Sequence, residues 1–228
     1  EGLHGGHAHI AQVEAGHEYL AITDHSPRLK VAHGLSAERL ARQLELIADL
    51  NEGPLPIRIL AGIEVDILSA GDLDQSHAML KQLDVVVASV HSELRMASVP
   101  MTYRMVTAIA NPATSVLGHC TGRLIAGERG RRPSSDFDAE VVFEACRQFG
   151  VAVEINSRPE RTDPPDDLLR LANEIGCLFA IDTDAHATGQ LEFLGYGAAR
   201  AEAAGVSHDR IVNTWPLADL LAWTRRHR

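Results

Sequence analysis

Short apolar segments alternate along the chain with amphipathic segments, and this alternation constrains the fold more than any other feature. The apolar segments are candidate strands: Tyr19–Thr23, Ile57–Val65, Val85–Val90, Ser115–Leu117, Val151–Ile155 and Cys177–Ile181, with a further short one at Ile211–Val212. The amphipathic segments are candidate helices: Ser36–Asn51, Asp138–Phe149, Pro165–Ile175 and Leu217–Thr224. Strands separated by helices predict parallel pairing with right-handed crossovers. About six or seven such units favour an α/β barrel over an open sheet.

The helix boundaries carry their own signals. Ser36 precedes a series of leucine and isoleucine residues at helical spacing, so we expect it to be an N-cap. Gly150 and Gly176 directly follow two candidate helices, where glycine is the usual stop.

Polar residues of the kinds that bind metal ions stand at the ends of the candidate strands. Six motifs occur in order, and five directly follow an apolar run: Thr23-Asp24-His25, Gly62-Ile63-Glu64, Ser89-Val90-His91, Gly118-His119, Glu154-Ile155-Asn156 and Asp182-Thr183-Asp184-Ala185-His186. In a parallel barrel the carboxyl ends of the strands meet at one face, so these side chains are expected to converge. Histidine together with carboxylate suits Zn, Mn or Fe(II). The pattern predicts a metal-dependent hydrolase.

Composition limits the partners. The formal net charge of −10 opposes binding to nucleic acid and to anionic membranes. It does not exclude a small phosphorylated substrate, because bound divalent cations make a pocket locally positive. The three cysteines are widely spaced, and the sequence has no membrane-length apolar run or signal peptide, which favours a cytoplasmic protein. We expect one domain over residues 1–228.

The motifs AITDHS, AGIEVDI, VVASVHS, LGHCTGR, VEINSRP and DTDAH resemble those of the PHP (polymerase and histidinol phosphatase) superfamily. They are most similar to stand-alone PHP proteins and to the PHP domain of bacterial family X DNA polymerases. The resemblance runs from about Gly16 to about Trp223 and includes NTWP at Asn213–Pro216. It implies a distorted, TIM-like (β/α)7 barrel with a typically trinuclear site. We therefore expect two or three divalent ions of Zn, Mn or Fe.

The resemblance also implies roles for individual residues. Glu64 would bridge the first and second metals, and Glu64, Asp184 and His186 are the expected catalytic residues. Arg123 and Arg158 would bind the substrate phosphate, and Asn156 would contact substrate or orient a ligand. The implied metal ligands are His25, Glu64, His91, His119, Asp184 and His186.

The chain departs from the family at its beginning. The family's opening strand carries His-x-His, whereas His7-Ala8-His9 stands only 16 residues before His25. The span from His9 to Gly16 must also hold the first helix, so we expect His7 and His9 at the helix start, with the first strand shortened or missing, and the less favoured alternative is that they are the family's ligands. Alternatively, Leu3-His4 is a remnant of that strand. The sequence therefore leaves undecided whether the first metal, with Asp184, and the third, with His25 and His186, are bound, while the ligands of the second, Glu64, His91 and His119, are all present.

Three functions are compatible with these observations. The leading hypothesis is a histidinol-phosphatase-like enzyme that hydrolyses a small phosphomonoester with a metal-activated hydroxide. The second is a 3′–5′ exonuclease or DNA-end phosphatase, which the net charge disfavours. The third is a metal-binding module without catalysis.

Overall fold

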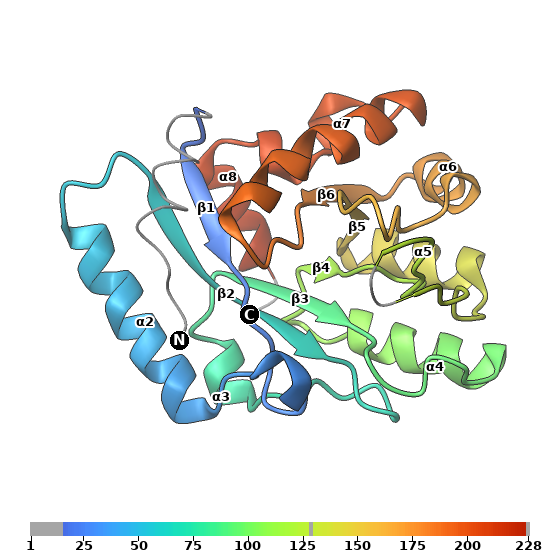
Figure 1. The fold of residues 1–228 in the computed structure, drawn as a ribbon, viewed down its shortest axis with the longest axis horizontal. Helices are drawn as coiled ribbons and strands as arrows, with labels where there is room; N and C mark the ends of the chain where they lie inside the picture. The colour runs from blue at the N-terminus through green and yellow to red at the C-terminus, as the bar shows by residue number, and fades with distance from the viewer. Residues whose placement is uncertain (1–15, 128–129, 227–228) are drawn as a thin grey trace.

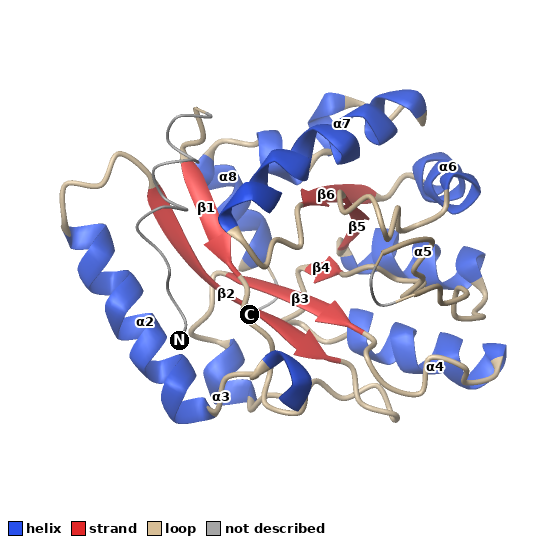
Figure 2. Cartoon of the chain, in the orientation of Figure 1, coloured by secondary structure: helices blue, strands red, loops and turns tan. Residues whose placement is uncertain are grey.

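Six parallel strands form one curled sheet at the centre of the molecule, with helices around its outside (Figures 1 and 2). The computed structural model describes residues 16–127 and 130–226. The strands pair in chain order: β1 Tyr19–Ile22, β2 Arg58–Asp66, β3 Val85–Ser89, β4 Val116–Leu117, β5 Ala152–Asn156 and β6 Leu178–Asp182. The helices are α2 Ala37–Glu52, α3 His77–Leu80, α4 Ser98–Ile109, α5 Ala139–Phe149, α6 Asp166–Ile175, α7 Leu194–Ala203 and α8 Leu217–Thr224. Short 3-10 helices are η1 Lys30–Ala32, η2 Thr188–Phe193, η3 His208–Arg210 and η4 Val212–Thr214.

The predicted TIM-like α/β fold is confirmed, and each of the six main predicted strands occurs within one residue of its expected ends. Ser36 and Asp138 are N-caps whose side chains accept backbone hydrogen bonds, and Gly150 and Gly176 end their helices with positive φ. Helices α3, α4 and α7 were not predicted. The opening residues His4, His7 and His9 lie outside the described residues.

The expected seventh strand at Ile211–Val212 is wrong, because within the described segments this region makes only one bridge, between Ile211 and Phe179. Side chains replace the missing ladder. The amide of Asn213 accepts from Ile181 N at 2.7 Å and donates to Ile181 O at 3.0 Å. On the other side, Tyr19 Oη donates to Trp215 O at 2.8 Å. The NTWP segment therefore joins β6 to β1 without forming a strand.

The concave side of the sheet is apolar at one end and polar at the other. Leu60, Val87, Ala152 and Ala180 form a buried cluster with Trp223 of α8. Residues two positions apart on a strand share a face, so Leu60 and Glu64 of β2 point to the same side. Apolar packing against α8 therefore fills the part of the concave side that is away from the carboxyl ends of the strands. The polar groups lie at those carboxyl ends.

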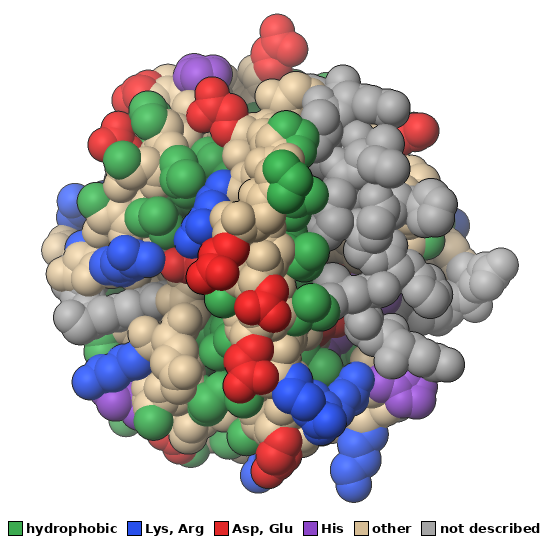
Figure 3. Space-filling view, turned by 90° about the vertical axis from the view of Figure 1, so that its left-hand side faces the viewer, with side chains coloured by type: hydrophobic (Ala, Val, Ile, Leu, Met, Phe, Trp, Pro, Cys, Tyr) green, Lys and Arg blue, Asp and Glu red, His purple; other side chains and the backbone are tan. Residues whose placement is uncertain are grey.

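The outer surface is mixed. The face in Figure 3 has acidic, basic and hydrophobic side chains interspersed. None of the helices in the described part of the chain is long and apolar enough to cross a membrane.

Candidate metal centre

Glu64 lies on the concave side of β2, among three histidines that follow the neighbouring strands. The backbone positions this carboxylate, because Glu64 N donates to Asp24 O at 2.9 Å and Ser26 N donates to Glu64 O at 3.0 Å. The ladder between β1 and β2 thereby continues as a bridge between His25 and Glu64. His25 follows β1, His91 follows β3 and His119 follows β4.

The imidazoles converge on the carboxylate. His25 Nδ1 is 3.2 Å from Glu64 Oε2, while His91 Nε2 and His119 Nε2 are 3.2 and 3.4 Å from Oε1. The two Nε2 atoms of His91 and His119 lie 3.2 Å apart. Buried atoms His25 Nδ1 and Glu64 Oε1 have no hydrogen-bond partner despite these short distances.

This arrangement fits a divalent cation. Buried polar atoms without partners are costly, and two neutral imidazole nitrogens facing each other need a proton or a cation between them. The candidate ligand atoms of His25, Glu64 and His91 all lie within 4.8 Å of one another. Histidine nitrogen and carboxylate oxygen are a donor set suited to Zn and related metals.

Two further carboxylates lie next to the ring nitrogens of His91 and His119 that face away from Glu64. Asp66 Oδ1 accepts from the backbone N of His91 at 3.0 Å and lies 3.4 Å from its Nδ1. Glu154 Oε2 lies 3.2 Å from His119 Nδ1 and also accepts from the backbone N of His119. A carboxylate on one ring nitrogen orients the other toward a metal. Glu154 was not predicted to act, although it precedes Asn156 by two residues on the same strand face.

Asp184 lies across the site, beyond the end of β6. Its backbone has φ 49°, a left-handed conformation that aspartate adopts more readily than most residues. Its Oδ2 accepts from Arg161 Nε at 2.8 Å and from Asn156 Nδ2 at 3.2 Å. Its Oδ1 is 3.6 Å from His186 Nδ1. The His186 ring lies 5.9 Å from that of His25, centroid to centroid, and half of its side chain is exposed at the mouth of the site.

The expected phosphate-binding arginines are differently engaged. Arg158 Nη1 donates to Asp184 O at 3.0 Å, and its Nε donates to Glu160 Oε1 at 2.9 Å. Arg123 donates through Nε to Arg161 O at 3.1 Å and through Nη2 to Thr162 O. Arg158 therefore lies within the site, whereas Arg123 holds a neighbouring loop.

Electrostatics favour bound cations. Burial lowers the pKa of His119 to about 4, with the charge of Arg161 acting in the same direction, so this ring is neutral and able to bind a metal. Burial also raises the pKa of Asp182 to about 8, together with the charges of Glu154 and Asp184. Burial disfavours the charge on His91, but Asp66 and Glu64 outweigh it and raise the pKa to about 9, so in the metal-free chain this ring holds a proton that a bound cation would displace. Crowded carboxylates of this kind are stabilised by divalent ions.

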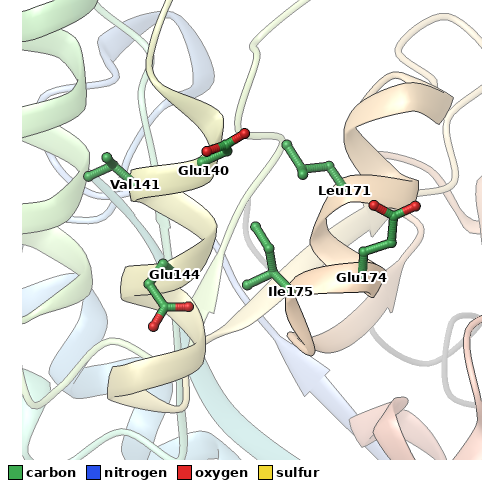
Figure 4. Close-up of a pocket in the computed structure, with 6 residues that line it drawn as sticks. All are labelled: Glu140, Val141, Glu144, Leu171, Glu174 and Ile175. Carbon is green, nitrogen blue, oxygen red and sulfur yellow. The ribbon is translucent and has the colours of Figure 1, made fainter.

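A groove on the outer helices is chemically different. It has a volume of about 530 Å³ between α5 and α6, and Figure 4 shows its lining residues. They are Glu140, Val141, Glu144, Leu171, Glu174 and Ile175. None is a histidine, and the groove is remote from the strand ends that carry Glu64.

Comparisons with known proteins agree with the geometry. No family model matches the chain. The DNA polymerase/3′–5′ exonuclease PolX of Bacillus subtilis (strain 168) is 37% identical over 217 residues, which cover 95% of this chain and 37% of that protein. The chain thus spans little more than a third of that relative's length. A probable phosphatase of Thermoanaerobacter sp. (strain X514) is 28% identical over 87% of this chain and 79% of its own length.

A solved structure has the same fold. Histidinol phosphate phosphatase from Lactococcus lactis, complexed with zinc, L-histidinol and phosphate, superposes with a TM-score of 0.59 and 16% identity. The match covers 89% of this chain and 88% of that one. The matching fold and these relatives confirm the resemblance of the chain to the PHP superfamily that its ordered motifs indicate.

Proposed function

We propose that this chain is a metal-dependent phosphoesterase that hydrolyses a small phosphomonoester. The observation that carries the proposal is the convergence of three imidazoles on the buried carboxylate of Glu64. The names of the relatives support it, since one is a probable phosphatase and the Lactococcus enzyme was solved with zinc, L-histidinol and phosphate. Residues 1–228 would act as a single hydrolase domain, because all six strands belong to one sheet.

Two or three divalent ions, of Zn, Mn or Fe, would be held at the strand ends. When bound, such ions activate water and neutralise charge on phosphoryl oxygens. Their proposed ligands are His25, Glu64, His91, His119, Asp184 and His186.

The chain's own residues prepare this site in three ways. Glu154 holds the ring of His119, and Asp66 holds the backbone of His91 and lies 3.4 Å from its Nδ1, so that both Nε2 atoms face Glu64. Burial excludes competing water, which strengthens every charge interaction within the site. Arg158 lies beside the half-exposed His186 and holds Asp184 O, and to bind a substrate phosphate it would exchange its contact with Glu160 for one with the phosphate.

A second candidate is hydrolysis of nucleic-acid phosphodiesters. The 37% identity to a protein named as a 3′–5′ exonuclease favours it, whereas the net charge of −10 opposes it. Cleavage of a single-stranded oligonucleotide that weakens steeply with salt would favour this candidate. Resistance of the oligonucleotide under conditions where a phosphomonoester is cleaved would exclude it.

The test combines metal analysis with turnover. We would purify the untagged protein without added metal, measure Zn, Mn and Fe per chain, and screen phosphomonoesters that include histidinol phosphate. We expect at least two equivalents and turnover. Glu64→Ala should lose both, while Glu45→Ala, an exposed glutamate of α2, should lose neither.

Two results would contradict the proposal. One is a Glu64→Ala variant that keeps its metal and its activity. The other is a wild-type chain that turns over no phosphoester with any divalent ion, as expected for a metal-binding module without catalysis.

A further inference from the structure

Arg161 is a buried arginine that the sequence motifs did not single out. Its side chain is only 6% exposed, and it lies five residues beyond the end of β5. Its Nε donates to Asp184 Oδ2 at 2.8 Å, and its Nη1 is a buried donor with no hydrogen-bond partner. Burying a guanidinium is costly unless it is paired, so the contact with Asp184 is the main compensation for its burial.

A loop whose two ends are hydrogen-bonded to each other places the Arg161 side chain in the site. The backbone N of Asn156 donates to Asp163 O at 2.9 Å, which joins the two ends of the segment between them. Within it, Arg161 N donates to Arg158 O at 3.0 Å, and Arg161 O accepts from Arg123 Nε at 3.1 Å. The buried carboxylate of Asp163 then accepts from Thr121 Oγ1 at 2.7 Å and fastens the loop to the segment after His119. The position of Arg161 is therefore fixed from both sides.

The two carboxylate oxygens of Asp184 have different partners. Arg161 and Asn156 both bind Oδ2 and leave Oδ1 on the side of His186. Arg158 also holds the carbonyl of Asp184. These contacts secure a residue whose backbone is in the left-handed region and whose side chain is one of the candidate metal ligands.

Arg104 shows what a purely structural buried arginine looks like in the same fold. Its Nε, Nη1 and Nη2 all donate to protein oxygens, in Ile67, Leu68 and Ser92. Arg104 therefore ties together two loops and touches no carboxylate. Arg161 instead presents its charge to Asp184 and keeps a donor uncommitted.

We propose that Arg161 is a positioning residue that holds Oδ2 of Asp184 and so directs Oδ1 toward a bound metal. This inference rests on the proposed function, because it assigns Asp184 to a metal. It predicts that loss of Arg161 weakens metal binding through Asp184 and not through a general loss of structure.

The experiment measures metal affinity on the metal-free protein, by competition of Zn²⁺ and Mn²⁺ against a chelator. Arg161→Met should weaken binding about 10- to 100-fold, the usual effect of removing a group that orients a ligand. Arg161→Lys, which keeps the charge, should recover part of the loss. Arg170→Met, an exposed arginine of α6, is the matched control and should bind as the wild type does.

A double variant separates positioning from folding. In an Asp184→Asn background, Arg161→Met should cause little further loss of metal affinity, because the carboxylate that it positions is gone. Circular dichroism and thermal unfolding of each metal-free variant report whether the fold persists. Equal losses with and without the Asp184 carboxylate would overturn the proposal, since a structural arginine would act in both backgrounds.

The remaining outcomes are also decisive. If the wild type binds metal and Arg161→Met binds it with unchanged affinity and stoichiometry, the inference fails while the proposed function stands. If the wild type binds no metal, both fail together.

Discussion

Replacing Glu154 by glutamine tests whether the carboxylates behind the histidines create the metal centre. Three donors reach Glu154: the backbone N and Nδ1 of His119, and Nδ2 of Asn156, which is 3.1 Å from Oε1. A glutamine has one carbonyl oxygen in place of two carboxylate oxygens, and its amide group would face a donor. Glu154→Gln therefore removes at least one charge-assisted hydrogen bond, and the His119 ring loses its fixed orientation.

The expected magnitude follows from that loss. A hydrogen bond to a charged group contributes about 1.5–3 kcal/mol. Because about 1.4 kcal/mol corresponds to a tenfold change in binding, metal affinity should fall about 10- to 150-fold. The free energy of unfolding of the metal-free protein should change less than the metal affinity does. Burial raises the pKa of Glu154 well above its usual value in the metal-free chain, so the carboxyl would be charged only when a bound cation offsets the neighbouring carboxylates, and replacing it by a neutral group should cost the metal-free fold less.

Chelator competition measures the metal affinity, and urea unfolding of the metal-free protein measures stability. Glu174→Gln, an exposed residue of the groove in Figure 4, is the matched control and should change neither quantity. A Glu154→Gln variant whose metal affinity stays within about threefold of the wild type would refute the reasoning, since the carboxylate would then have no part in orienting His119.

Three further predictions concern the scaffold. Asn213→Ala removes two hydrogen bonds from Ile181 and should lower the free energy of unfolding by about 1–3 kcal/mol in urea, with metal content per chain unchanged. Gly118→Ala should destabilise the fold in thermal melts by about 1–3 kcal/mol, because the new Cβ would overlap Ser89 Oγ, and adding Ser89→Ala should restore part of the loss. Burial raises the pKa of Cys177 to about 12, so a thiol reagent at pH 8 should label it only after unfolding. The same shift means that Cys177 favours the folded state below pH 9, its usual pKa, and that this contribution falls as pH rises toward 12, which alkaline urea titrations would detect.

The central strands were predictable because their residues are buried on both faces. In β3, all five residues from Val85 to Ser89 are buried, which gives the continuous apolar run that the sequence displays. A polar residue directly after such a run must lie at the end of the sheet. For that reason the sequence alone predicts that His91 and Glu64 share a site.

Helix α4 was harder to predict, because some of its residues break the usual amphipathic pattern. Val99 and Tyr103 are 82% and 71% exposed, whereas Arg104 is fully buried. The buried face does carry Met101 and Met105, but exposed hydrophobic residues and one buried arginine hide this pattern in the sequence. The strand predicted at Ile211–Val212 failed for a related reason. Asn213 supplies a donor and an acceptor from its side chain, and a sequence does not reveal that an amide will replace a strand ladder.

The arginines explain why the site was only partly predictable. Sequence motifs select residues by type and by nearness to a strand end, and both criteria favour Arg123 and Arg158. Binding to phosphate requires donors that the protein has not already engaged, and Arg123 uses its Nε and Nη2 to hold the carbonyls of Arg161 and Thr162. Arg161 lies in an irregular loop and reaches Asp184 only because the ends of that loop meet at Asn156 and Asp163. The role of each arginine is thus set by which partners the loops bring within reach, so variants of Arg123 should act on metal binding only through the position of Arg161.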